Sequence, residues 1–190
     1  MRVKGPGYRI ILAVIFLLVA YDSRLKTESA FAEGDKFSFP VMEKAFLEGQ
    51  YQKAVNEAVG LIDEGSPNRA EIYYIKGVSE LKLGRYEAAR KSFQYIISRY
   101  ASSKRIFDAY IGLGDSYYME KDLNAAIEAY EEAVFKFPKD ENAAIADFRL
   151  AICYAAMGDA TRANEFSDKA RKAAPLSFEA REPMRIAASR

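Results

Sequence analysis

The side chains that could do chemistry in this sequence form three small groups. Neighbouring carboxylates occur at Glu131–Glu132 and at Asp140–Glu141, and such pairs can act as acid–base catalysts or calcium ligands. Cys153 is the only thiol, and Gly112–Gly114 has the spacing of a glycine-rich cofactor loop. Histidine, the commonest general base and transition-metal ligand, is absent from all 190 residues.

Each group has a plainer interpretation than catalysis. The carboxylates fall on an outer helix or in a turn, where solvated surface explains them. Cys153 lies between Ile152 and Tyr154 in an apolar stretch and has no histidine to activate it, which favours a small buried residue. Gly114 falls inside a helical segment, where close helix packing accounts for a glycine. We therefore expect no enzyme, and no catalytic, cofactor or metal site.

The elements that carry these residues are repeated along the chain. Ala89, Ala126 and Ala163 are spaced 37 residues apart, and each stands at the same point of a similar segment. A weaker copy begins near Gly49, with Ala54 placed 35 residues before Ala89. Apolar spacing is helical throughout, so each segment predicts a hairpin of two helices.

Small residues and helix breakers explain how each segment can form a hairpin of two closely packed helices. Two helices that cross closely need small residues at the crossing. Gly84 and Gly158 stand where the first helix must end, because glycine adopts positive φ without steric cost. Pro138 and Pro175 terminate second helices. The small residues are Gly77, Gly114 and Ala151 on the first helices and Ala89, Ala126 and Ala163 on the second.

On these residues the chain resembles the tetratricopeptide repeat (TPR) family over about residues 36–175. The resemblance implies an all-α fold, a right-handed superhelical solenoid of about four helical hairpins. Tyr110 replaces the usual tryptophan of the third unit, and Glu80 replaces a common tyrosine in the second. Ser167 stands where the fourth unit would have an aromatic residue. The opening helix of the first unit is poor because it contains Pro40.

The two ends of the chain differ from the repeats. Residues 1–32 place basic residues before an apolar run at 10–20, the pattern of a secretory signal, and Ala30–Ala32 suits cleavage after Ala32. An uncleaved inner-membrane anchor is the alternative, since a long polar stretch precedes the cut. We expect the repeat array at 33–175. Residues 176–190 would form a short capping segment, which Pro183 interrupts.

Charge and cysteine content narrow the partner class. Removing the five basic and two acidic residues of 1–32 leaves 23 Lys/Arg against 25 Asp/Glu, a balance that argues against duplex nucleic acid. A single cysteine cannot form an internal disulfide. No cysteine stands directly after the apolar run, where a lipoprotein would carry its lipid. Membrane contact is expected only through the N-terminal segment, if that segment remains uncleaved.

In the family, the first helix of each hairpin lines a concave groove that holds a partner. Carried over by register, the candidates are Tyr74, Val78, Leu81, Lys82, Asp108, Ile111, Asp115, Tyr118, Phe148, Ile152 and Ala155. The resemblance implies a wall of aromatic and aliphatic side chains with two carboxylates. Some of these side chains could instead pack between hairpins.

The chemistry of this wall suggests what it binds. Some family members hold a peptide carboxylate with lysine, asparagine and arginine, but Tyr74, Val78 and Ile111 stand at such positions here, and Asp115 would repel a carboxylate. The sequence favours a partner segment with apolar anchors and a basic residue facing Asp108 or Asp115.

The repeat junctions and the N-terminus suggest where the protein works. Arg99–Ser103, followed by Ala109–Gly114, resembles junctions in bacterial periplasmic TPR proteins of the outer-membrane assembly and Tol-Pal type, although Ala101 replaces a proline. We expect a periplasmic or secreted scaffold that binds an envelope protein or peptide segment. The alternative is a structural, self-assembling module that pairs through its terminal hairpins.

Overall fold

A computed structural model describes residues 37–140 and 142–173, and this part of the chain is all-α. The helices are α2 (Phe39–Leu47), α3 (Tyr51–Asp63), α4 (Arg69–Lys82), α5 (Tyr86–Arg99), α6 (Ile106–Met119), α7 (Leu123–Lys136), α8 (Ala143–Ala156) and α9 (Ala160–Ala173). The predicted solenoid of helical hairpins is confirmed.

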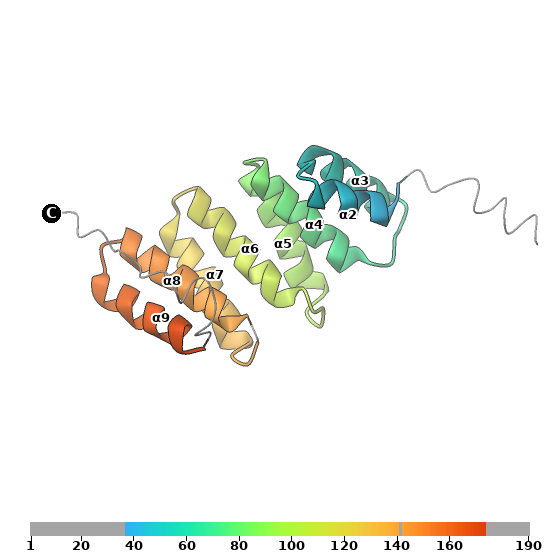
Figure 1. Ribbon diagram of the computed structural model, residues 1–190. Coiled ribbons are helices and arrows are strands. Elements are labelled where there is room, and N and C mark those ends of the chain that lie inside the picture. The colour runs from blue at the N-terminus through green and yellow to red at the C-terminus, as the bar shows by residue number, and fades with distance from the viewer. Residues whose placement is uncertain (1–36, 141, 174–190) are drawn as a thin grey trace, which may run out of the picture. The chain divides into compact units, whose positions relative to one another are not determined.

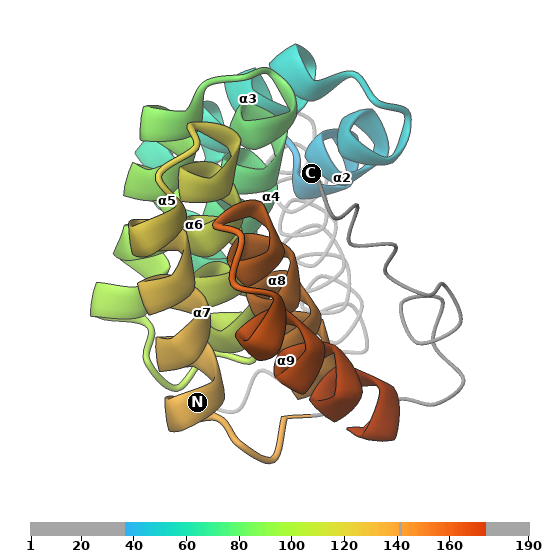
Figure 2. The same ribbon diagram turned by 90° about the vertical axis from the view of Figure 1, so that its left-hand side faces the viewer.

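The helices pair in sequence order, and the pairs stack (Figure 1). Hairpins α2–α3, α4–α5, α6–α7 and α8–α9 each contact the next through α3 with α4, α5 with α6, and α7 with α8. The first helices α4 and α6 also touch directly. Figure 2 looks along the row, with α8 and α9 in front of the earlier hairpins. Stacking buries the apolar face that one hairpin alone would expose.

The repeated small residues lie at the helix crossings, as predicted. Ala54, Ala89, Ala126 and Ala163 are all completely buried. Beside Gly77 an added Cβ would lie 2.8 Å from the Phe93 ring, inside van der Waals contact. The same ring also occupies the space beside Gly112. Gly112 and Gly114 are therefore packing positions in a helix, and no cofactor loop is formed there.

The turn inside each hairpin needs one residue at positive φ. Gly49, Gly84 and Gly158 take φ values of 74°, 73° and 81°, as glycine readily does. In the third hairpin the same place is held by Lys121 at φ 65°, a conformation that costs energy for a residue with a side chain. The turn geometry is thus conserved across the repeats even where glycine is missing.

The first hairpin is better formed than its sequence suggested. Pro40 lies in the first turn of α2, where a missing N–H breaks no helical hydrogen bond. The predicted signal segment 1–32, the predicted cap 176–190 and Pro175 fall outside the described residues. Within the described part, no helix is both long and apolar enough to cross a membrane.

Candidate functional site

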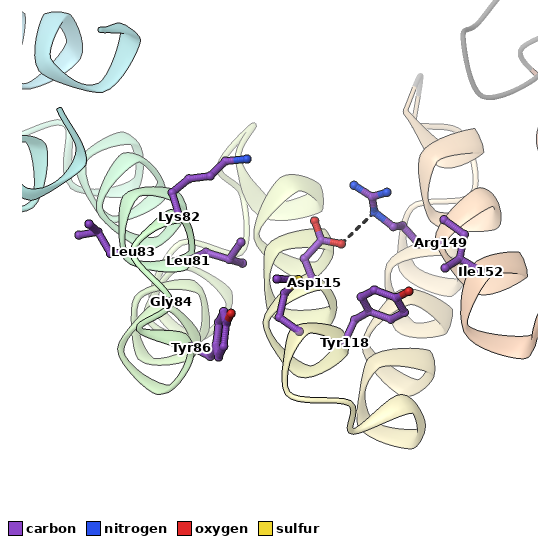
Figure 3. Close-up of a pocket in the computed structure, with 10 residues that line it drawn as sticks. Leu81, Lys82, Leu83, Gly84, Tyr86, Asp115, Tyr118, Arg149 and Ile152 are labelled. Carbon is purple, nitrogen blue, oxygen red and sulfur yellow. Dashed lines mark ion pairs between the residues drawn. The ribbon is translucent and has the colours of Figure 1, made fainter. Parts of the chain in front are cut away.

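A hollow of about 600 Å³ opens where the first helices of the last three hairpins meet. The C-terminal end of α4, the first turn of α5, and the inner faces of α6 and α8 line it (Figure 3). Its lining residues are Leu81, Lys82, Leu83, Gly84, Tyr86, Asp115, Tyr118, Met119, Arg149 and Ile152.

Helical spacing places these side chains together. Asp115 and Tyr118 on α6, and Arg149 and Ile152 on α8, are each three residues apart, so each pair shares one helix face. The end of α4 brings Lys82 to the rim. The wall therefore combines apolar surface with one lysine, one arginine and one aspartate.

Asp115 is the electrostatic centre of this hollow. Its Oδ1 lies 2.8 Å from Arg149 Nε, and the two side chains point toward one another between α6 and α8 (Figure 3). The buried Nε–H is not aligned for a hydrogen bond, so the contact is an ion pair only. The Tyr130 hydroxyl donates a hydrogen bond to the same oxygen at 2.7 Å. The pKa of Tyr130 is raised, mainly by burial and secondly by the negative charge of this carboxylate.

A second arginine holds the neighbouring part of the inner wall. Arg105 donates Nε and Nη2 to the two carboxylate oxygens of Glu71, each at 2.7 Å, and Nη1 to Asp108 at 2.9 Å. Its guanidinium also lies 4.5 Å from the centre of the Tyr74 ring. The bond to Glu71 is the main cause that raises the pKa of Arg105. The starts of α4 and α6 are thereby joined.

The structure brings only part of the predicted groove set together. Five of the eleven candidates line the hollow: Leu81, Lys82, Asp115, Tyr118 and Ile152. Val78 packs against the core around Phe93, and Ile111 packs between two core clusters. Tyr74 and Asp108 belong to the Arg105 cluster, and half-buried Phe148 lies outside the hollow. Whether any of them binds a partner remains a prediction.

The structure changes the expected role of Asp108 and Asp115 in partner binding. Both carboxylates already have arginine partners in this chain, Arg105 and Arg149. A partner's basic residue would meet a neutralised aspartate, and Asp115 has little charge left to repel a carboxylate. With Lys82 added, the hollow carries a net positive charge.

Five lining residues lie outside the predicted set: Leu83, Gly84, Tyr86, Met119 and Arg149. Arg149 lies one helical turn before Ile152, so the spacing of that candidate held enough information to find it. Tyr86 and Met119 flank the hairpin turns, and their position depends on how neighbouring hairpins stack. No signal in a single repeat places them in the hollow.

The residues considered for catalysis have structural roles in the described part of the chain. Cys153 is fully buried, and desolvation raises the pKa of its thiol to about 11. No group of three or more carboxylate or cysteine side chains is arranged to hold a metal ion among the described residues. The hollow combines apolar side chains with a few charged ones, a mixture that is typical of binding surfaces.

Comparisons with known proteins agree with this architecture. A family model described as tetratricopeptide repeat matches residues 48–104, 81–141 and 112–178. Among curated proteins, none matches the sequence at a significant level.

Similar solved structures share the fold at low identity. MamA residues 41 to the end, from Desulfovibrio magneticus RS-1, is 22% identical over 94% of this chain and 99% of that chain, with a TM-score of 0.63. YrrB, titled a TPR protein with an unusual peptide-binding site, is 20% identical over 90% and 85%, with a TM-score of 0.62. A Rap protein complexed with competence and sporulation factor is 22% identical over 72% and 41%, with a TM-score of 0.63.

Proposed function

Because this chain belongs to the tetratricopeptide repeat family, we propose that it is a non-catalytic scaffold that binds a segment of a partner protein. The observation that carries the proposal is the hollow of about 600 Å³ between α4, α6 and α8, with its apolar wall and charged rim. YrrB, with the same fold, is titled as peptide-binding, which supports this class of partner.

The chemistry of the hollow defines the segment. Leu81, Tyr118 and Ile152 offer apolar surface to a large side chain such as leucine or phenylalanine. Lys82 has no carboxylate partner within the described residues, and Arg149 is only partly satisfied by Asp115. The segment that fits best therefore carries an acidic residue beside its apolar anchor.

Selection from a random peptide library tests this specificity. Peptides selected on the full chain should be enriched in Asp or Glu next to a large apolar residue. Lys82→Glu should shift the selection away from acidic peptides, whereas Lys139→Glu, an equal charge change at an exposed loop residue outside the hollow, should not. Identical selections on both variants would contradict binding at this hollow.

We also propose that the scaffold works in the bacterial cell envelope on an envelope protein. The support is the signal-like pattern of residues 1–32 and the resemblance of the repeat junctions to periplasmic TPR proteins. N-terminal sequencing of the protein from a cell-envelope fraction tests this. A start after Ala32 supports export and cleavage, a start at Met1 in the membrane fraction supports an anchor, and a purely cytoplasmic protein refutes both.

Self-assembly through the terminal hairpins is a second candidate. Three large apolar residues of the first hairpin are exposed: Val41 at 38%, Leu47 at 76% and Val59 at 43%. Sedimentation of the full chain at tens of micromolar tests this alternative. A dimer or larger species that Leu47→Lys disperses supports it, and a monomer rules it out.

A further inference from the structure

A second hollow, of about 340 Å³, lies at the N-terminal end of α4, whereas the first hollow, called the groove from here on, lies at the C-terminal end of this helix. The start of α4 at Asn68–Glu71 forms one side, and the α5–α6 connection from Arg99 to Arg105 forms the other. With 14 residues, α4 separates the two hollows by about 20 Å. A ligand here would not compete with a segment in the groove.

Positive charge dominates this second hollow. Arg105 is neutralised by Glu71 and Asp108. The other three cations, Arg69, Arg99 and Lys104, form no ion pair with any carboxylate of the described chain. Arg69 donates to the Ile62 carbonyl at 3.3 Å, which leaves its charge uncompensated. Three unpaired cations around one concave surface attract an anion.

The next repeat junction lacks part of this positive charge. One repeat later, 37 residues along, Glu141 stands in place of Lys104 and Asp140 in place of Ser103. The α7–α8 connection thus carries acidic residues in a hairpin junction of the same kind. Arg99 has a basic counterpart in Lys136, whereas Lys104 has none, so the full cluster of cations occurs at the α5–α6 connection and not at the α7–α8 connection.

We propose that the second hollow binds a phosphate-bearing ligand. A single carboxylate is satisfied by one arginine, as Glu71 is by Arg105. A phosphate monoester carries nearly two charges and three acceptor oxygens, which match three unpaired cations better. Ser103 Oγ accepts from the Arg105 N–H at 3.1 Å, so its own O–H can be donated to the ligand. The volume suits a small molecule.

Titration of the full chain with inorganic phosphate at constant ionic strength, followed by backbone-amide NMR, tests the site. Saturable shifts are expected at residues 69–71 and 102–105. The Arg99→Gln/Lys104→Gln double variant should weaken binding at least about tenfold, because each charged hydrogen bond lost is worth roughly that factor. The control Lys91→Gln/Lys139→Gln removes two exposed positive charges elsewhere and should bind phosphate normally.

Two results would overturn the proposal. Acetate at equal ionic strength could give the same shifts, which would mean unspecific anion binding, or the double variant could keep its affinity. Vesicles then identify the source of the phosphate. A lipid headgroup is indicated if the unaltered protein sediments with phosphatidic acid vesicles but not with phosphatidylcholine vesicles, and if the double variant no longer sediments with either. Phosphate binding without vesicle binding indicates a soluble ester.

Discussion

The ring of Tyr130 occupies the space beside Gly114 in which any larger residue would carry its Cβ. The hydroxyl of the same tyrosine donates to Asp115 at 2.7 Å. Packing at the α6–α7 crossing and the position of the groove carboxylate are therefore coupled through one side chain. Gly114, which does not itself line the hollow, thus helps to set the geometry of the hollow.

Replacing Gly114 with alanine should destabilise the protein by about 1–3 kcal/mol, because the fully buried Tyr130 ring has no free space to move into. The midpoint of urea unfolding measures this change. Gln94→Ala on the exposed face of α5 is the control and should change the midpoint little. An unchanged midpoint for the Gly114 variant would show that the crossing can relax.

Lys121→Gly should stabilise the protein by about 0.5–1 kcal/mol. Lys121 is the single described residue other than glycine with positive φ, at 65°, and relief of that strain exceeds the extra flexibility glycine gives the unfolded chain. Thermal unfolding of Lys121→Gly and of Lys121→Ala separates the effect of backbone strain from the effect of the lost charge, because both variants remove the charge but only glycine relieves the strain. If alanine stabilises as much as glycine, loss of the lysine charge is the cause.

Glu80 should be a strongly stabilising residue although it departs from the family pattern. It is only 4% exposed, pairs with Lys76, and accepts from the Ser92 hydroxyl at 2.7 Å. Glu80→Ala leaves the lysine charge unpaired and should cost about 3 kcal/mol. Lys76→Met/Glu80→Met removes both charges together and should cost much less, as urea unfolding can show. Equal losses in the two variants would mean that packing, and not charge, dominates.

Cys153 should resist thiol reagents in the native protein. Desolvation raises its pKa to about 11, so only about one thiol in a thousand is ionised at pH 8. Labelling with a chromogenic disulfide should be slow until denaturant is added. The same shift predicts that stability falls as pH rises from about 9 to 11, because the unfolded thiol ionises before the folded one. Fast native labelling would show that the fourth hairpin opens.

The sequence predicted the hairpin architecture because its determinants are local. The buried alanines, the glycine turns and the proline stops each act within one repeat, so periodicity alone locates them. The contents of the hollow depend on three hairpins at once. Arg149 reaches Asp115 across an interface between hairpins, and Arg105 reaches Glu71 across another. Such pairs have sequence separations of about one repeat but no pattern of their own. Helical spacing could have placed Arg149 on the inner face of α8, but the pairing that neutralises Asp115 could not be predicted from the sequence.

Single substitutions of Asp115 and Arg149 should change the affinity for an acidic peptide in opposite directions. Asp115→Asn removes the negative charge and releases Arg149, so an acidic peptide selected on the unaltered chain should bind more tightly. Arg149→Gln leaves Asp115 unneutralised and should weaken the same peptide. Both side chains are about a third exposed, so screening limits each effect to roughly 1 kcal/mol, or about fivefold. Fluorescence anisotropy of a labelled peptide measures both. A peptide with its acidic residue replaced by glutamine is the control, and equal responses of the two peptides would remove the acidic residue from the recognition model.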